Sequence, residues 1–225
     1  MAEETRKITA DMLAEDPFHP ARVNFEKDMS AAPVFALALI AVNVLAYAWE
    51  LSVGALKSRD AIIAAGAIYG EKVLAGQGWR LLTGMFLHGG LAHLLGNCVA
   101  LYILGLVSER AWGRSRSLFI YLGSGLAASF ISAVMQPMPA VGASGAIFGL
   151  MGAVIVFFYR YGGAFCARER RIGSALLGWG LFQLGMGLLT PYVDNWAHLG
   201  GLASGVIFGI TLPSGLFEND GRSVK

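Results

Sequence analysis

Six long apolar segments constrain this chain more than any other feature of its sequence. Most of them approach the ~20 residues that a helix needs to span a bilayer. The segments are residues 33–53, 90–108, 117–135, 144–159, 172–190 and 196–212. Only 14% of the residues are charged and 56% are hydrophobic, a balance that does not suit a soluble fold. We therefore predict an all-α, polytopic membrane protein, a bundle of six transmembrane helices in contact with membrane lipid.

Glycine is frequent in this apolar background. It supplies 30 of 225 residues, roughly twice the usual share of about 7%. Most of these glycines lie inside the apolar segments, where small residues let helix backbones approach one another. We therefore expect close helix packing.

The positions of Lys and Arg predict the orientation, because short cytoplasmic loops collect these residues. If the N-terminal tail is inside, 13 of the 17 bases lie on the inner side. The other four lie in the long connection between the first two helices. This favours cytosolic N and C termini, with tails at residues 1–32 and 213–225 around a membrane domain at 33–212.

The N-terminal tail and the net charge narrow the location and the partners. Residues 1–32 have mixed charge and no apolar run, so they do not resemble a cleavable secretory signal. They are also not poor in acids, as a transit peptide would be, which favours a bacterial inner (plasma) membrane. A net charge of +2 is too small to indicate nucleic acid as a partner.

The connection at residues 54–89 is long and partly apolar, and we expect it to lie in or on the outer leaflet. An interfacial helix is one interpretation, with Trp79 and Arg80 as ordinary interface anchors.

Few polar side chains lie within the apolar segments, and in lipid each one needs a reason. They are Asn43, Glu50, His93, Asn97, Glu109, Ser144, Gln183 and His198, with Asp194 at a helix start.

Ser144 differs from the other serines because it lies in Gly142-Ala143-Ser144-Gly145, where a loop passes into the fourth segment. From Ser144 to Arg160 a helix would rise only ~24 Å, against a bilayer core of ~30 Å. We therefore expect Ser144 at a helix N-terminus inside the membrane, where free N–H groups stabilise negative charge.

His198 lies near the outer end of the sixth segment, at a depth similar to that of Ser144. Alone, a membrane histidine is as well explained by a hydrogen bond to another helix. Together, Ser144 and His198 supply a nucleophile and a general base, the minimum for acyl transfer.

His93 and Asn97 are four residues apart, so both side chains fall on one face of the second helix. Two donors aimed at one point are what an oxyanion hole requires. The alternative is a polar pair that ties helices together.

A metal site is the rival interpretation of the histidines. His88 and His93 lie about 140° apart round a helix, and no acid completes a His-Glu-x-x-His arrangement. Asp194, the nearest carboxylate, is more simply an N-cap. We expect neither a metal nor an organic cofactor.

Taken together, these residues resemble the rhomboid family of intramembrane serine proteases over about residues 33–212. The spacing His88-x4-His93-x3-Asn97 after Trp79-Arg80 is similar to the family's loop and helix signature. Gly142-Ala143-Ser144-Gly145 is similar to its nucleophile motif, and Ala197-His198-x-x-Gly201 to the helix that carries its base. Gly105-x3-Glu109-x3-Gly113 is similar to a further family motif, to which we assign structure.

The resemblance implies a role for each matching residue. Ser144 would be the nucleophile and His198 the base of a dyad without an acid. His93, Asn97 and the Ser144 N–H would hold the oxyanion. Phe148 departs from the Tyr of many relatives, and its ring would still stack on His198. The substrates implied are transmembrane proteins cut near the outer face.

Two other functions remain to be weighed. A non-catalytic rhomboid-like protein would bind transmembrane helices without needing the nucleophile. A secondary transporter would show an inverted repeat, and the sequence has none. Within the protease hypothesis, the fifth segment is a candidate substrate gate because Gly173, Gly178, Gly180, Gly185 and Gly187 weaken its helix. Glycine-mediated packing is the alternative.

Overall fold

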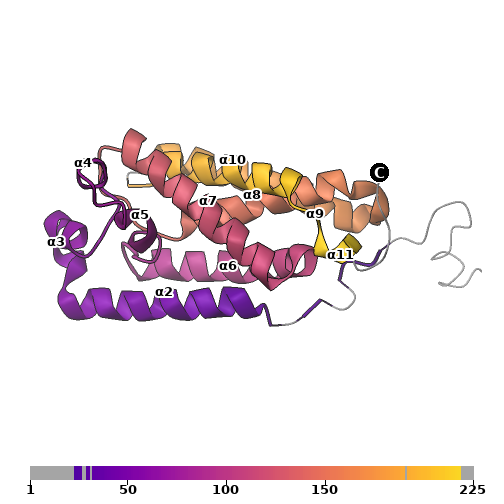
Figure 1. Ribbon diagram of the computed structural model, residues 1–225, viewed down its shortest axis with the longest axis horizontal. Coiled ribbons are helices and arrows are strands. Elements are labelled where there is room, and N and C mark those ends of the chain that lie inside the picture. The colour runs from indigo at the N-terminus through magenta and orange to yellow at the C-terminus, as the bar shows by residue number, and fades with distance from the viewer. Residues whose placement is uncertain (1–22, 27–28, 31, 191, 219–225) are drawn as a thin grey trace, which may run out of the picture.

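The computed structural model describes residues 23–218 except 27, 28, 31 and 191, so most of both predicted tails lies outside it. Six long helices make up the body of the molecule (Figure 1). They are α2 (Val34–Val53), α6 (Leu91–Trp112), α7 (Arg114–Met135), α8 (Ser144–Arg160), α9 (Ala167–Leu189) and α10 (Asn195–Thr211). Each one falls on a predicted apolar segment, which confirms the all-α, polytopic fold.

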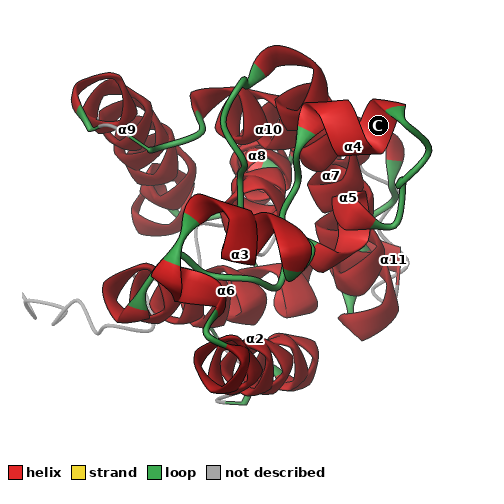
Figure 2. Ribbon diagram, turned by 90° about the vertical axis from the view of Figure 1, so that its left-hand side faces the viewer, coloured by secondary structure: helices red, strands yellow, loops and turns green. Residues whose placement is uncertain are grey.

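The helices differ in length as the sequence predicted. Within the described residues, five helical segments are long and apolar enough to cross a membrane, and the last of them runs from Asn195 to Phe217, beyond the end of α10. The shorter α8, with 17 residues, is not among them. The short α8 lies among α6, α7, α9 and α10 (Figure 2), and 12 of its residues are buried. It is therefore the central helix of the bundle.

The packing of α8 on α10 depends on glycines. A Cβ at Gly201 would overlap the carbonyl oxygen of Gly145, and one at Gly205 would overlap that of Gly149. Such overlap forces backbones apart, so only glycine permits this approach. The predicted close packing is thus present between these two helices.

The connection between α2 and α6 folds into four short helices at one end of the bundle (Figure 1). They are η1 (Ala55–Lys57), α3 (Arg59–Ala64), α4 (Gly70–Leu74) and α5 (Arg80–Thr83). Ile68 forms an antiparallel bridge with Ala140, in the loop before α8. The connection is therefore joined to the loop that leads into Ser144.

Arg80 ties this connection together from the inside. Its side chain is 5% exposed and donates to the carbonyl oxygens of Ile63 at 2.6 Å and Ala67 at 3.1 Å and to Gln77 Oε1 at 2.7 Å. Trp79, which is half-exposed, covers the guanidinium at 4.6 Å. A buried guanidinium with three acceptors does more than anchor an interface.

At the opposite end of the bundle, α11 (Gly215–Glu218) packs against α6 and α8, and residues 23–26 pack against α8 and α9 (Figure 1). Phe25 is 1% exposed among aromatic rings that include Phe157, Phe158 and Phe165. Its N–H donates to Glu169 Oε1 at 2.5 Å. The start of α9 is therefore fastened to the chain that precedes α2.

Glu109, near the C-terminal end of α6, lies at the same end of the bundle as α11. Its Oε1 accepts the Phe35 N–H at 2.8 Å, one of the N–H groups that the start of α2 leaves without a helical partner. This contact agrees with a structural role and places Glu109 far from the start of α8.

We predict that Arg80→Ala destabilises the protein by about 2–4 kcal/mol, because it leaves buried acceptors unpaired. Thermal denaturation in detergent measures the change. Arg59→Ala is the matched control, since Arg59 is exposed and reaches only the Tyr69 hydroxyl at 3.4 Å. Equal shifts in the two variants would contradict the role assigned to Arg80.

Candidate active site

Ser144 is the first residue of α8, as predicted. The chain reaches it through Gly142, whose φ of 129° favours glycine. The Gly142 N–H donates to the Gly84 carbonyl oxygen at 2.9 Å. Since the first N–H groups of a helix lack partners within it, Ser144 brings a hydroxyl and a free backbone donor to the same point.

His198 lies in the first turn of α10 and faces Ser144. Its Nε2 is 3.0 Å from Ser144 Oγ, and the ring is 8% exposed. Phe148, one turn into α8, stacks on the imidazole with ring centroids 4.2 Å apart and planes at 7°. The structure thus brings the His198 side chain of α10 into contact with Ser144 and Phe148, which both lie on α8.

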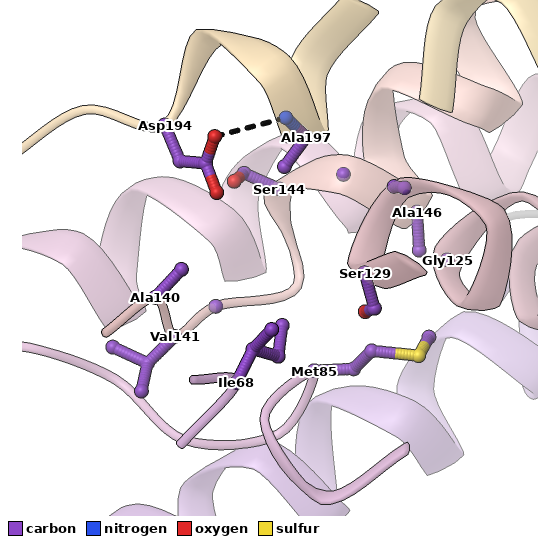
Figure 3. Close-up of a pocket in the computed structure, with 13 residues that line it drawn as sticks. Ile68, Met85, Gly125, Ser129, Ala140, Val141, Ser144, Ala146, Asp194 and Ala197 are labelled. Carbon is purple, nitrogen blue, oxygen red and sulfur yellow. Dashed lines mark hydrogen bonds between the residues drawn. The ribbon is translucent and has the colours of Figure 1, made fainter. Parts of the chain in front are cut away.

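Asp194 fixes the turn that carries His198 (Figure 3). Its Oδ1 accepts the Ala197 N–H at 3.0 Å, which confirms the predicted N-cap. The Ser132 hydroxyl, from the end of α7, donates to the other carboxylate oxygen. This second contact, which the sequence did not reveal, joins α7 to α10 beside the site.

A small cavity of about 20 Å³ adjoins Ser144. Its lining includes Asp194, Ser129, Met85 and Ile68 (Figure 3). Since a water molecule needs roughly 10–15 Å³, the cavity has room for one beside the hydroxyl.

His93 and Asn97 flank the approach to Ser144 from α6. A Cβ built on Gly142 would lie 2.8 Å from His93 Nε2 and 3.5 Å from Asn97 Nδ2. Asn97 is 7% exposed, and its Nδ2 has no hydrogen-bond partner among the described residues. Two side-chain nitrogens therefore meet at the glycine that precedes the serine turn.

His88 lies behind His93, with ring centroids 5.2 Å apart and planes at 65°. Its Nδ1 is 3.1 Å from the Phe86 carbonyl oxygen, which can only accept, so Nδ1 carries the proton. Burial, and then the neighbouring His93, lower the pKa of His88 to about 4. His88 is therefore a neutral, buried ring at neutral pH.

Glu50 holds the backbone of this same loop. It is fully buried near the C-terminal end of α2, and its two carboxyl oxygens accept from the backbone N–H of His88 at 3.0 and 3.1 Å. The sequence singled out Glu50 only as a polar residue in an apolar segment. Its partner is 38 positions away, and no local pattern indicates it.

Other predicted residues lie outside the site or only support it. Trp79, Arg80 and Glu109 do not line the cavity beside Ser144. Gly145 and Gly201 form the contact between α8 and α10. Within the described part of the chain, no three His, Cys, Asp or Glu side chains gather in a way that could hold a metal ion.

The apolar helices define a multi-pass membrane protein. In this protein a serine and a histidine are in contact at the starts of two helices. The sequence comparison makes the class specific, because the rhomboid domain matches residues 75–215, more than half of the chain. The chain belongs to the rhomboid family.

Several curated proteins are similar to this chain. Rhomboid protease GluP of Bacillus subtilis (strain 168) is 36% identical over 173 residues, which cover 77% of this chain and 34% of that protein. RHOMBOID-like protein 4 of Arabidopsis thaliana is 40% identical over 144 residues, 63% of this chain and 36% of that protein. Rhomboid-like protease 5 of Toxoplasma gondii is 40% identical over 139 residues, 60% and 16% of the two chains. This chain thus spans about a third of the length of the first two.

We predict that Gly142→Ala destabilises the protein by about 1–3 kcal/mol, because the methyl group would sit in a left-handed conformation against His93. The control is Gly96→Ala in α6, where an added Cβ meets nothing within 4 Å and should be neutral or stabilising. Thermal denaturation in detergent compares the two. A Gly142→Ala variant as stable as Gly96→Ala would refute the tight contact.

Proposed function

We propose that this chain is an intramembrane serine endopeptidase that cleaves transmembrane-helix substrates near the outer membrane face. The observation that carries the proposal is the 3.0 Å contact between His198 Nε2 and Ser144 Oγ. A serine activated by an adjacent general base is the arrangement used for acyl transfer.

The first step is attack on a peptide carbonyl. The Ser144 hydroxyl gives its proton to His198 Nε2, while Oγ bonds to the carbonyl carbon. The scissile C–N bond then breaks, and His198 returns the proton to the leaving amine. Because His198 Nδ1 has no hydrogen-bond partner among the described residues, the base works as part of a dyad, and Phe148 orients its ring.

The developing oxyanion lies between three donors. The Ser144 N–H opens α8, and His93 and Asn97 point toward Gly142 from α6. The partial positive charge at a helix N-terminus adds to their effect. The unpaired Asn97 Nδ2 supports this role, since a buried donor without a partner is costly unless a ligand uses it.

Water completes the reaction. It attacks the acyl-enzyme ester with His198 as base, releases the new carboxyl terminus and restores the serine. The cavity beside Ser144 is the place from which this water would come, because it is lined by polar as well as apolar groups.

The substrate enters past α9. In its most apolar stretch 11% of the residues are buried, against 44% in α7, so α9 is the helix least held by its neighbours. Gly173 and Gly180 do pack on α8, whereas Gly178 and Gly185 face open space. One face of α9 therefore packs on α8 through glycines, whereas Gly178 and Gly185 make no such contact.

The substrate must unwind locally, because a helical carbonyl is shielded and hydrogen-bonded. We therefore expect cleavage beside helix-destabilising residues, with small side chains at the cut. The distribution of bases favours cytosolic N and C termini, and the acid-containing N-terminal tail favours a bacterial inner membrane.

The names of two similar proteins, GluP and Rhomboid-like protease 5, support the proteolytic function. The competing function is a non-catalytic rhomboid-like protein that binds transmembrane helices. The contact between Ser144 and His198 favours the protease, since binding alone needs no nucleophile.

We predict that Ser144→Ala and His198→Ala each lower cleavage of a reporter transmembrane substrate by about 10³-fold or more. The assay uses purified protein in one detergent. Ser204→Ala is the control, because this serine of α10 bonds only to the carbonyl oxygens of its own helix. Full cleavage by folded Ser144→Ala would place the nucleophile elsewhere, and absence of cleavage by every form would favour the binding protein.

We predict that Asn97→Ala lowers kcat by about 10²- to 10³-fold with little change in KM, because an oxyanion donor acts in the transition state. Its neighbour Cys98, a free thiol, provides the control variant Cys98→Ala, which should keep kcat. If the two variants showed the same kcat and the same KM, the prediction would fail. Asn97 would then be assigned to helix packing instead.

A further inference from the structure

The fully buried side chain of Glu50, in α2, holds the loop that leads into α6, the helix that carries the proposed oxyanion donors His93 and Asn97. Glu50 is 0% exposed, and both its carboxyl oxygens accept from the backbone N–H of His88, at 3.0 and 3.1 Å. Burial of a carboxyl group in an apolar helix carries a free-energy cost. Its contact with the backbone of His88 therefore points to a role.

His88 is linked to the candidate active site through His93. The His88 ring is 0% exposed and lies edge-on to His93 at 5.2 Å. His93 in turn borders Gly142, two residues before Ser144. Each member of this series is packed against the next, so a shift of the His88 backbone would move the His93 ring.

The loop at residues 84–90 needs such an anchor. At its beginning, the Gly84 carbonyl accepts the Gly142 N–H at 2.9 Å. At its end, Gly90 has a φ of 157° and the first turn of α6 has no side-chain cap. The bond from Glu50 to the backbone of His88 therefore fixes the loop two residues before its end at Gly90 and five residues before His93.

We propose that Glu50 is a positioning residue for the reaction: by holding the His88 backbone it sets the His93 side chain against the oxyanion. The inference rests on the proposed proteolytic function. Glu50 touches neither Ser144 nor His198, so it acts only through the loop and His93. A misplacement of about 1 Å in such a site can lower the rate on the order of 10²-fold.

The test is a double-mutant cycle between Glu50 and His93, with cleavage of a reporter transmembrane substrate as the measurement. Glu50→Leu removes the acceptor and should lower kcat by about 10-fold or more, with KM changed less than about threefold. Glu50→Gln keeps one acceptor oxygen and should retain most of kcat. In a His93→Ala background, Glu50→Leu should cost less than about twofold, because the two residues act in one series.

Asn43→Leu is the matched control. Asn43 is also fully buried in α2, two helical turns before Glu50, and its loss should lower kcat equally with and without His93. If Glu50→Leu does not fold, Glu50→Asp completes the same cycle, because it keeps the carboxyl group and withdraws it from the backbone of His88.

The outcomes separate the two proposals. Cleavage by wild type with additive effects of Glu50 and His93 variants would overturn the positioning role and leave the protease intact. A Glu50→Leu variant with wild-type kcat would do the same. Absence of cleavage by wild type would remove the proposed function, and the positioning role with it.

Discussion

The site depends on the close contact between α8 and α10. In lipid no hydrophobic force draws apolar helices together, so their association relies on packing of small residues. Here Gly201 and Gly205 lie directly on the carbonyl oxygens of Gly145 and Gly149, which leaves one register for the two helices. That register puts the first turn of α10 beside the first turn of α8. The 3.0 Å contact between Ser144 and His198 is therefore a consequence of four glycines that take no part in the chemistry.

A second requirement is support for the irregular backbone that leads into Ser144, because α8, with 17 residues, would begin below the surface of the proposed membrane. Such backbone is stable in a membrane only where protein or water satisfies its polar groups. The loop before α8 meets this need by pairing with the connection between α2 and α6. Ile68 and Ala140 exchange hydrogen bonds at 2.9 and 2.8 Å, and Gly142 donates to Gly84 at 2.9 Å. The connection is thus structural backing for the site, held in turn by Arg80.

The sequence predicted what depends on local pattern. The six helices follow from apolar length, the start of α8 at Ser144 from the loop that passes into the fourth apolar segment, and the shared face of His93 and Asn97 from a spacing of four. It did not predict the contacts of Glu50 with His88, of Ser132 with Asp194, or of Phe25 with Glu169, which span 38, 62 and 144 positions. Each joins two elements whose neighbourhood is set by packing of the whole bundle, so neither partner carries a local signature of the other.

A protease in a membrane must hold its catalytic groups still and yet admit a whole helix, and the bundle separates these demands. At its N-terminal end, α9 is fastened by the capping contact of Glu169 with Cys166 and by the Phe25 N–H. Toward its C-terminal end, Asn195 donates to the Leu184 carbonyl at 3.1 Å, and few side chains are buried. In the proposed protease, α9 would therefore open at its C-terminal end about a fixed N-terminal end. Since Glu50, Asp194 and the glycines of α8 and α10 lie on other elements, this opening would leave Ser144, His198 and His93 in place.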